Sequence, residues 1–374
     1  MTPRVSVVVN TINRADSLRR TLLSLQLLDY PELEVVVVVG PSTDHTDAVA
    51  AEFADTMKIV RCDDANLSVS RNLGIRHASG EIVAFIDDDG VPDPWWLDDL
   101  VRAFDDPEVA AAGGPVYDFD GRLFSMYSVA DSHGDPSIAT DGPNPTRLLA
   151  APHTDLFVTP LGTNSAFRRS AVVAVGGFDE EFKYFLDETE VCRRLVDEGW
   201  VVEAYERGYV LHLRVPSAVR TEQRGTRNLF PVLRSRLYFA LRHALPRSGL
   251  LEVMRRYDRT VDSYRAARRW EIDNGMLDPG DLDVFEQDAV RAVDDALDGA
   301  RRGPQTRPPS WFDENGDGFV ALRRTLPARR LHVCIVSHEY PPKPLNGVGR
   351  LSHELAVALA EKGHVVRVLT EGVG

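Results

Sequence analysis

Only three cysteines, Cys62, Cys192 and Cys334, occur among the 374 residues, and they lie far apart without a CxxC pair. This scarcity argues against a disulfide framework or a structural zinc site and indicates a reducing compartment. The chain also has no apolar run near the roughly 18 residues that cross a membrane. The apolar segment that ends at Asn10 is too short for a signal peptide. We therefore expect a globular, cytoplasmic protein.

Basic residues are in deficit, because 43 Lys and Arg stand against 57 Asp and Glu, for a net charge of −14. Such a chain is not expected to coat nucleic acid by counterion release. An anionic substrate would need a metal ion or a local group of arginines. Hydrophobic residues make up 43% of the sequence and charged residues 27%, a mix that supports a buried core.

Strands and helices alternate along the first part of the chain. Runs at residues 5–9, 33–39, 58–60 and 81–86 are rich in β-branched residues and predict buried strands. Helices are expected from Asp16 to Leu25, over residues 48–53, and from Ser68 or Ser70 to Gly80. The pattern predicts an α/β fold with a sheet flanked by helices and ligands at the carboxyl ends of its strands.

The rest of the chain divides by composition. Residues 121–160 are rich in Asp, Pro, Ser and Gly and predict a long loop over an active site. We expect four parts: a domain at 1–220, a helical region at 221–302, a linker at 303–330 and a βαβ segment at 331–374. The basic stretch 234–247, with Tyr238 and Phe239, is either a packing helix or a peripheral helix on the inner face of a membrane. The charged helical region could also join subunits of a homo-oligomer.

Three adjacent acids, Asp87, Asp88 and Asp89, follow the fourth predicted strand. Neighbouring carboxylates repel one another, so a bound cation would favour this arrangement. Hard oxygen ligands select Mg²⁺ or Mn²⁺ over zinc, and these ions commonly share their coordination with substrate phosphates. The alternative is an acidic loop that is solvated or caps the next helix.

In this context the chain resembles the family 2 glycosyltransferases of the GT-A fold over about residues 4–220. The resemblance is carried by the acidic triplet, by Asn66–Gly74 and by the run from Ala78 to Ile86. It implies a GT-A, Rossmann-like mixed sheet and an inverting transfer of sugar from a nucleoside-diphosphate sugar. The implied donor-binding residues are Thr11, Asn13, Arg14, Ser42, Asp44, Arg71, Asn72, Asp87 and Asp88. Taken singly, several of these could be turn or cap residues. Val39 replaces the Asp that usually precedes the Ser-Thr-Asp turn, which leaves the nucleobase open.

The same resemblance places the acceptor side later in the chain. Gly162 and Asn164 match an acceptor-binding segment, and Asp187–Val191 matches a Glu-Asp-x-Asp-Leu motif. Glu188 is the implied catalytic base and Asp187 the competing candidate, unless both acids serve only the helix dipole. His212 matches a metal ligand that would join Asp87 and Asp89 around Mn²⁺ or Mg²⁺. A buried structural histidine is the alternative.

The sequence thus predicts a metal-dependent glycosyltransferase whose acceptor hydroxyl belongs to a glycan or a lipid-linked saccharide. Two rivals are a nucleotidyltransferase acting on sugar phosphates and a non-catalytic module that binds nucleotide sugars. The segment from Val333 to Tyr340, followed by Gly347-Val348-Gly349, resembles the start of a family 4, GT-B glycosyltransferase domain. It would be the truncated beginning of a second enzyme.

Overall fold

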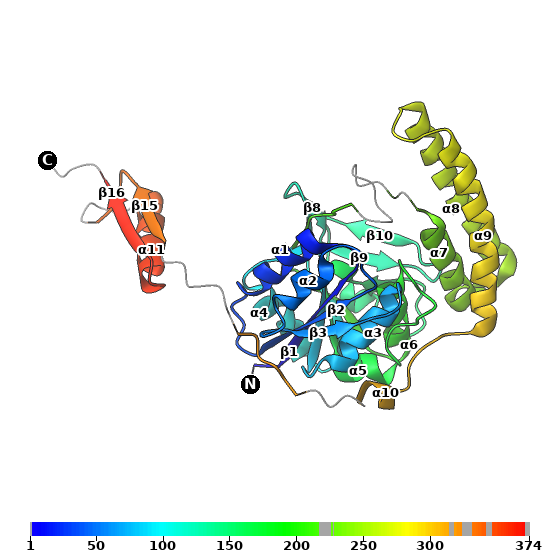
Figure 1. Cartoon of the computed structure of the whole chain (residues 1–374), viewed down its shortest axis with the longest axis horizontal. Coiled ribbons are helices and arrows are strands. Elements are labelled where there is room, and N and C mark those ends of the chain that lie inside the picture. The colour runs from blue at the N-terminus through cyan, green and yellow to red at the C-terminus, as the bar shows by residue number, and fades with distance from the viewer. Residues whose placement is uncertain are drawn as a thin grey trace. The chain divides into compact units, whose positions relative to one another are not determined.

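The fold is described from a computed structural model, which covers residues 2–216, 226, 228–313, 318–323, 331–341 and 346–370. The chain divides into two compact units, Met1–Arg323 and Arg324–Gly374. The predicted domain at 1–220 and the predicted helical region both lie in the first unit, and the βαβ segment forms the second (Figure 1).

The first unit is built on a mixed sheet with strand order β13-β6-β12-β4-β1-β2-β3. The pairs of β1 with β2, β1 with β4 and β2 with β3 are parallel, whereas β12 runs antiparallel to both β4 and β6. The strands are β1 (Val5–Thr11), β2 (Leu33–Val39), β3 (Lys58–Arg61), β4 (Ile82–Asp87), β6 (Val109–Gly113), β12 (Ser165–Arg168) and β13 (Val201–Ala204). A mixed sheet flanked by helices is the predicted fold class, which is thereby confirmed.

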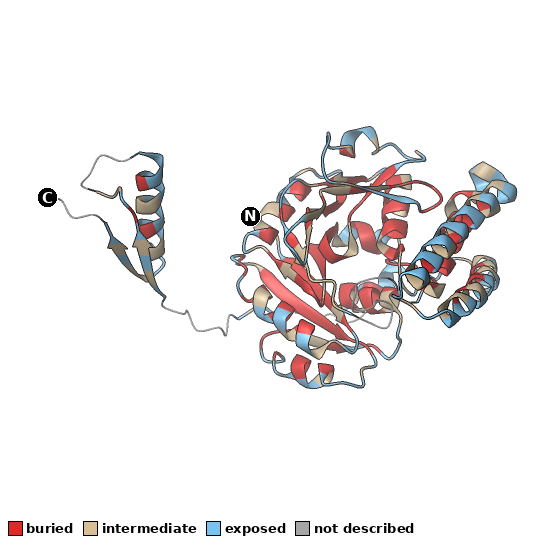
Figure 2. Cartoon of the chain, turned by 90° about the horizontal axis from the view of Figure 1, so that it is seen from above, coloured by how far each residue is buried: buried red, intermediate tan, exposed pale blue. Residues whose placement is uncertain are grey.

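The valine-rich strands are buried on both faces, as Figure 2 shows for the centre of the unit. Alternate residues of β1 and β2 enter two different cores because side chains of a strand point to opposite faces. One core takes in α1 (Ala15–Leu25) and α4 (Trp96–Leu100), and the other takes in α3 (Leu67–His77) and α6 (Asp187–Asp197). Gly74 allows α3 to pack closely, because a Cβ there would lie 2.4 Å from a methyl of Val8.

Short elements complete this unit. The helices are α2 (Thr46–Ala51) and α5 (Arg169–Ala174), with 3₁₀ turns at Val101–Asp105, Thr146–Leu148 and Gly162–Asn164. A four-stranded sheet has the order β5-β14-β7-β8, with β5 (Gly90–Pro92), β14 (Val210–His212), β7 (Val116–Asp118) and β8 (Leu123–Ser125). A three-stranded sheet joins β10 (Pro136–Ala139), β9 (Tyr127–Ala130) and β11 (Phe157–Thr159). The prediction of an irregular loop over 121–160 is therefore wrong where β8, β9, β10 and β11 form, whereas residues 140–156 contain no strand and only the 3₁₀ turn Thr146–Leu148.

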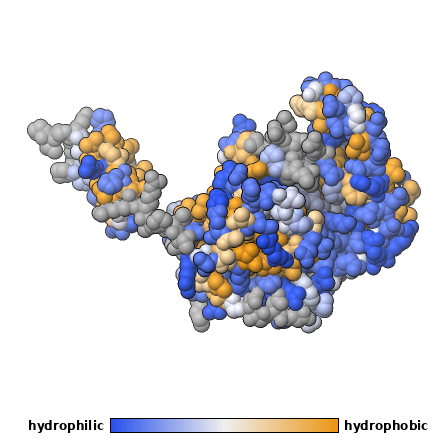
Figure 3. All heavy atoms as spheres, viewed as in Figure 1, coloured by the Kyte–Doolittle hydropathy of each residue, from blue (hydrophilic) through white to orange (hydrophobic). Residues whose placement is uncertain are grey.

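Four helices follow: α7 (Phe230–His243), α8 (Leu245–Asp273), α9 (Gly280–Arg302) and the short α10 (Pro309–Asp313). Figure 3 shows mostly hydrophilic residues over the visible face of α8 and α9. The helix α7 is different, because Tyr238 and Phe239 are fully buried and Arg234 is ion-paired with Glu181 and Asp295. The interpretation of 234–247 as a helix lying on a membrane is therefore wrong for these aromatic residues, which pack in the core. No helix within the described ranges is long and apolar enough to cross a membrane.

The second unit contains β15 (His332–Val336), α11 (Gly347–Glu361) and β16 (Val365–Leu369). The two strands pair in parallel, so the unit is the βαβ segment that the sequence predicts. Its strand residues Val336 and Leu369 remain exposed. Of the predicted linker at 303–330, residues 303–313 and 318–323 are described, and they include the short helix α10.

Candidate active site

The acidic triplet lies where β4 ends, beside the carboxyl end of β1. Asp88 accepts a hydrogen bond from the Thr11 hydroxyl at 2.7 Å. Asp89 is buried and accepts from Arg14 Nη1 at 3.0 Å and from the Val215 backbone N–H at 2.7 Å. Parallel pairing of β1 with β4 brings these distant residues to one edge of the sheet. We call this group the acidic edge.

Three groups at the acidic edge fit a divalent cation. One ligand atom from each of Asp87, Asp89 and His212 lies within 4.8 Å of the other two. His212 Nε2 is 3.2 Å from Asp89 Oδ1 and 3.6 Å from Asp87 Oδ2. The imidazole is carried by β14, which pairs with β5 immediately after the triplet. Two carboxylates and a neutral imidazole form a donor set suited to Mn²⁺.

The carboxyl groups of the triplet differ in their electrostatics. Burial raises the pKa of Asp88 to about 7, although the charge of Arg14 and the Thr11 hydroxyl oppose this shift. Burial also disfavours the ionised form of Asp89, but His212 and Arg14 outweigh it and hold its pKa below the usual range. The pKa of Asp87 is also raised, by loss of hydration at the site and by the charge of Asp89, and His212 opposes this shift. Asp89 is therefore a fixed negative charge, whereas Asp88 gains a proton near neutral pH.

The loops after β1 and β2 are tied to each other by the remaining predicted donor-binding residues. Asn13, whose φ is +54°, accepts from the Thr43 backbone N–H at 2.7 Å, and its own N–H donates to the Ser42 hydroxyl at 3.0 Å. Asp44 accepts from the Thr46 and Ala15 backbone N–H groups at 2.9 and 3.1 Å. These side chains form the turns beside Arg14. The exposed faces of Asn13 and Asp44 remain open to a nucleotide, which keeps their predicted role as a hypothesis.

A second charged group centres on Arg71, which is buried in α3. Its Nη1 donates to Asp187 Oδ2 and lies 3.4 Å from Glu188 Oε2. Its guanidinium carbon lies 5.6 Å from the ring centroid of Phe85 on β4, two residues before Asp87. Arg71 therefore links the start of α6 to the acidic edge through its charge and its packing.

Glu188 has the environment of a proton acceptor. Burial, followed by the charge of Asp187, raises its pKa to about 7, and Arg71 opposes the shift. Its side chain is 18% exposed, whereas that of Asp187 is 1% exposed and is held by Arg71. Phe185 and Leu186 precede it with φ values of +71° and +66°, so two consecutive residues with side chains occupy the left-handed region. Such strain is typical of functional sites, and here it leads directly into the two acids.

The acceptor-side predictions separate into two cases. A Cβ on Gly162 would lie 2.5 Å from Arg71 Nη2, so glycine lets the chain approach this buried guanidinium closely, and Glu188 Cδ lies 3.5 Å from the same position. Asn164 is fully buried, and its amide is committed to Trp96, Pro115 and Gly208. The structure therefore places Gly162 at the site and Asn164 beneath it.

Asn72 also lies beneath the site rather than in it. Its amide donates to Phe178 O at 2.9 Å and to Glu180 at 3.0 Å, and it accepts from the Phe178 N–H at 2.8 Å. The side chain is fully buried. Donor binding by Asn72 was an expectation from the resemblance, and these bonds instead indicate that it positions α3 against the segment before α6. Val39 is likewise fully buried, in the sheet.

The backbone N–H groups of Leu213 and Val215 also belong to the site, although the sequence does not predict them. The Leu213 N–H donates to Asp89 O at 3.0 Å, and the Val215 N–H donates to the Asp89 carboxylate. Backbone donors leave no signal in residue type, so no motif could have identified them.

A buried ion pair anchors the helix that carries Glu188. Glu190 is fully buried and accepts from Arg194 Nη2 at 2.7 Å and from the single N–H of Arg194 Nε, which lies 2.9 Å from both carboxylate oxygens; His243 Nε2 lies 3.4 Å away. Burial alone would favour the neutral acid, but the charge of Arg194 lowers the pKa of Glu190 to about 2. This depressed pKa stabilises the fold above the unfolded-state value near 4.5, and the contribution is lost as pH falls toward 2.

Glu190→Gln is therefore expected to lower the free energy of unfolding by about 3–5 kcal/mol, because Arg194 loses its buried counter-charge. Urea unfolding at neutral pH measures the change. Glu198→Gln is the matched control, since Glu198 is exposed just after the same helix and should change stability by less than about 0.5 kcal/mol. Equal effects of the two substitutions would contradict the assignment of Glu190 as an anchor.

The sheet, the acidic edge and Glu188 therefore describe an α/β protein with a candidate active site at the carboxyl ends of its strands. Residues 6–176 match the family model "Glycosyl transferase family 2". This part of the chain is thus similar to the family 2 glycosyltransferases, and the enzyme class that the sequence predicts, a glycosyltransferase, agrees with this match.

Curated relatives support the same class. A glucosyl-dolichyl phosphate glucuronosyltransferase of Haloferax volcanii is 30% identical over 190 residues, which cover 47% of this chain and 56% of the relative. The O-antigen biosynthesis protein RfbC of Myxococcus xanthus is 30% identical over 223 residues, 56% of this chain and 17% of the relative. The chain therefore spans about half, or less, of the length of these two relatives. The solved mannosyltransferase PcManGT from Pyrobaculum calidifontis, in complex with GDP-Man and Mn²⁺, aligns with a TM-score of 0.48 and 18% identity, over 79% of this chain and 87% of that one.

Proposed function

We propose that the protein transfers a sugar from a nucleoside-diphosphate sugar to an acceptor hydroxyl on a glycan or lipid-linked saccharide, with inversion at the anomeric carbon. The observation that carries this proposal is the coupling of two groups by Arg71. One group, Asp87 with Asp89 and His212, suits a divalent ion, and the other presents Glu188 with a pKa of about 7. Both are supplied largely by the ends of parallel strands and by α6, in and beside the family 2 domain.

In the proposed reaction Glu188 removes the proton of the acceptor hydroxyl as its oxygen bonds to the anomeric carbon. The bond from that carbon to the phosphate oxygen breaks, and the nucleoside diphosphate leaves with the electron pair. Asp187 neutralises Arg71 and, by its charge, keeps the pKa of Glu188 high enough to accept a proton. Gly162 leaves room for the Arg71 guanidinium beside Glu188.

Asp87, Asp89 and His212 would hold Mn²⁺ or Mg²⁺ in the proposal. When bound, such an ion neutralises charge on the diphosphate leaving group. Arg14 already contacts one oxygen of Asp89 while His212 lies beside the other. Arg14 can therefore orient Asp89 and add a positive charge near the same diphosphate.

The proposal is tested by the products and by their metal dependence. Thermal melting with UDP, GDP and dTDP, each with and without Mn²⁺, should identify the donor base, because a nucleotide that binds the folded state raises its stability. Incubation with the matching sugar nucleotide should then release nucleoside diphosphate. Pyrophosphate as the product would indicate a nucleotidyltransferase instead, and binding without turnover would indicate a non-catalytic module.

The pH dependence of transfer follows from the pKa of Glu188. Because the carboxylate form is the base, kcat is expected to rise about tenfold per pH unit below about pH 7 and to level off above it. Initial rates at saturating donor and Mn²⁺, between about pH 5 and about pH 9, measure this limb. Asp88 titrates in the same range, so the two carboxyl groups must be told apart by substitution. The rise of kcat with pH should be absent from the residual activity of Glu188→Gln and should remain in Asp88→Asn. A limb that persists in Glu188→Gln would contradict the assignment.

For the second unit we propose that the βαβ segment belongs to a family 4, GT-B type of fold. The support is its parallel β15–β16 pair and the glycines at the start of α11, which Asn346 caps through the Val348 and Gly349 N–H groups. An assay of the full chain with a second sugar nucleotide tests whether this segment adds a donor preference of its own.

A further inference from the structure

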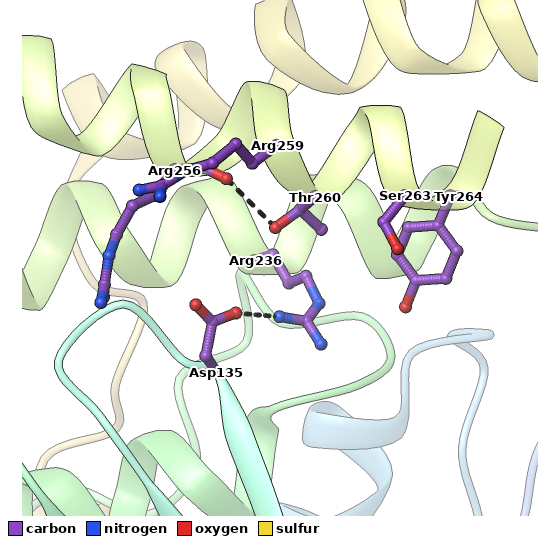
Figure 4. Close-up of a pocket in the computed structure, with 7 residues that line it drawn as sticks. All are labelled: Asp135, Arg236, Arg256, Arg259, Thr260, Ser263 and Tyr264. Atoms are coloured by element: carbon purple, nitrogen blue, oxygen red, sulfur yellow. Dashed lines mark hydrogen bonds and ion pairs between the residues drawn. The ribbon is translucent and has the colours of Figure 1, made fainter. Parts of the chain in front are cut away.

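A cavity of about 500 Å³ lies apart from the acidic edge, among residues of α7, α8 and the turn between β9 and β10 (Figure 4). Its lining consists of Asp135, Arg236, Arg256, Arg259, Thr260, Ser263 and Tyr264. Three guanidinium groups and three hydroxyls thus meet in a chain whose net charge is −14. We propose that this cavity, which we call the arginine cleft, binds a phosphate group of the acceptor. The inference deepens the proposed glycosyl transfer and rests on it.

The arginines keep hydrogen-bond donors in reserve. A guanidinium has five N–H donors, and Arg236 uses one of them on Asp135 at 2.5 Å. Arg259 is 65% exposed and lies 3.5 Å from Glu252, the limit of a hydrogen bond. A phosphate offers several acceptor oxygens and can therefore satisfy donors that the protein leaves unused.

Nearby carboxylates explain how the arginines coexist before a ligand binds. Arg256 Nη1 lies 2.6 Å from Asp131 Oδ2 and 2.7 Å from His133 Nδ1, which fixes its position on the wall. Asp135 offsets the charge of Arg236 in the same way, as the dashed line in Figure 4 shows. Asp135 is 46% exposed, so it can turn away when an anion takes its place. Removal of the Asp135 carboxylate should therefore increase the affinity of the cleft for phosphate.

The arginine cleft is in contact with the segment that leads to the proposed base. The guanidinium carbon of Arg236 lies 5.4 Å from the ring centroid of Phe185, three residues before Glu188. Gly134, beside Asp135, packs so closely that a Cβ there would lie 2.9 Å from Leu186 Cδ1. An acceptor that anchors its phosphate in the cleft could thus direct a hydroxyl toward the start of α6. The donor diphosphate has separate partners at the acidic edge.

The test measures the affinity of the full chain for inorganic phosphate by calorimetry without divalent metal. Arg259→Gln and Arg236→Gln are each expected to weaken binding about tenfold, and Asp135→Asn is expected to strengthen it several-fold. Arg255→Gln is the matched control. Arg255 is the same residue type on the same helix, is 61% exposed and also pairs with Glu252, but it does not line the cleft.

Two further measurements identify the source of the phosphate and separate this inference from the proposed function. Phosphatidylcholine vesicles that contain a polyprenyl phosphate should bind more tightly than phosphatidylcholine alone if the acceptor is a membrane lipid. Binding of free phosphate with no preference for these vesicles supports a soluble acceptor. Mn²⁺-dependent hydrolysis of the sugar nucleotide should proceed at the same rate in Arg259→Gln as in the wild type, because Arg259 does not belong to the acidic edge. If the wild type binds phosphate but does not hydrolyse the sugar nucleotide, only the proposed function is contradicted.

The arginine cleft is refuted if the wild type binds neither free phosphate nor the polyprenyl phosphate vesicles. It is equally refuted if Arg255→Gln weakens binding as much as Arg259→Gln, since the effect would then be one of net charge. A weaker affinity in Asp135→Asn would point to a cationic ligand and would also overturn the proposal.

Discussion

Asp89→Asn is expected to lower the rate of sugar transfer by about a thousandfold and to abolish the stabilisation of the protein by Mn²⁺. The charge of Asp89 is fixed at neutral pH, because His212 and Arg14 outweigh the cost of its burial and keep its pKa low. The amide of Asn keeps the shape of the side chain but not its charge. Metal-ion stabilisation of a leaving group is worth several kcal/mol, which corresponds to the expected loss.

Asp88→Asn is the matched control from the same triplet. Its carboxylate bonds to Thr11, does not belong to the proposed ligand set, and has a pKa of about 7, so an amide imitates its protonated form. We expect this variant to bind Mn²⁺ within about threefold of the wild type, by calorimetry. Because Asp89 also accepts from the Val215 N–H, circular dichroism must show that Asp89→Asn is folded. Asp87→Asn, at the more exposed ligand, provides a second test with fewer structural bonds at risk. Unchanged Mn²⁺ affinity in both ligand variants would refute the metal site.

The acidic edge could be predicted from the sequence because its signal is local. Asp87–Asp89 follow a hydrophobic run directly, and parallel strands bring their carboxyl ends to one edge. His212 could be assigned only through the resemblance, since its approach to Asp89 depends on the pairing of β14 with β5 across more than a hundred residues. No local pattern in the sequence indicates which residues of these two strands pair with each other.

The roles of two buried asparagines could not be predicted from the sequence. Asn72 and Asn164 stand in motifs that predict ligand contact, yet both side chains are consumed by hydrogen bonds to the fold. The same residue type fits the motif whether its amide binds a ligand or hydrogen-bonds to a neighbouring loop. Only the hydrogen-bond partners in the structure distinguish the two cases. The strands of 121–160 were missed for a related reason: their pairing partners supply the order that the local composition does not.

The arginine cleft was invisible to the sequence because its residues come from three separate segments. Arg236 is part of the basic stretch for which a membrane helix is one prediction, whereas Asp135 falls in the segment whose composition predicts a loop. The structure reassigns both, because α7 buries its aromatic residues and turns Arg236 toward the β9–β10 turn. The basic residues of this stretch are compatible with a membrane-bound helix, but the fold instead brings one of them, Arg236, to the lining of a cavity.

Glu188→Gln is expected to lower kcat by about a thousandfold with little change in the affinity for nucleotide. General base catalysis typically contributes 10²- to 10⁴-fold, and the amide cannot accept the proton of the acceptor hydroxyl. The side chain lies 3.4 Å from Arg71, so the substitution removes one of two carboxylates near this guanidinium while Asp187 remains paired with it. The fold should survive for this reason. Single-turnover transfer at saturating donor measures the effect.

Asp187→Asn separates the base from its neighbour. Asp187 is buried and paired with Arg71, so its loss leaves that guanidinium with Glu188 as its remaining carboxylate partner at this position. The pKa of Glu188 should then fall, since the charge of Asp187 is one cause of its elevation. The pH limb of kcat is therefore expected to move to lower pH in Asp187→Asn and to vanish in Glu188→Gln. If Glu188→Gln retained full activity while Asp187→Asn lost it, the proton acceptor would be Asp187, and Glu188 would only adjust its charge.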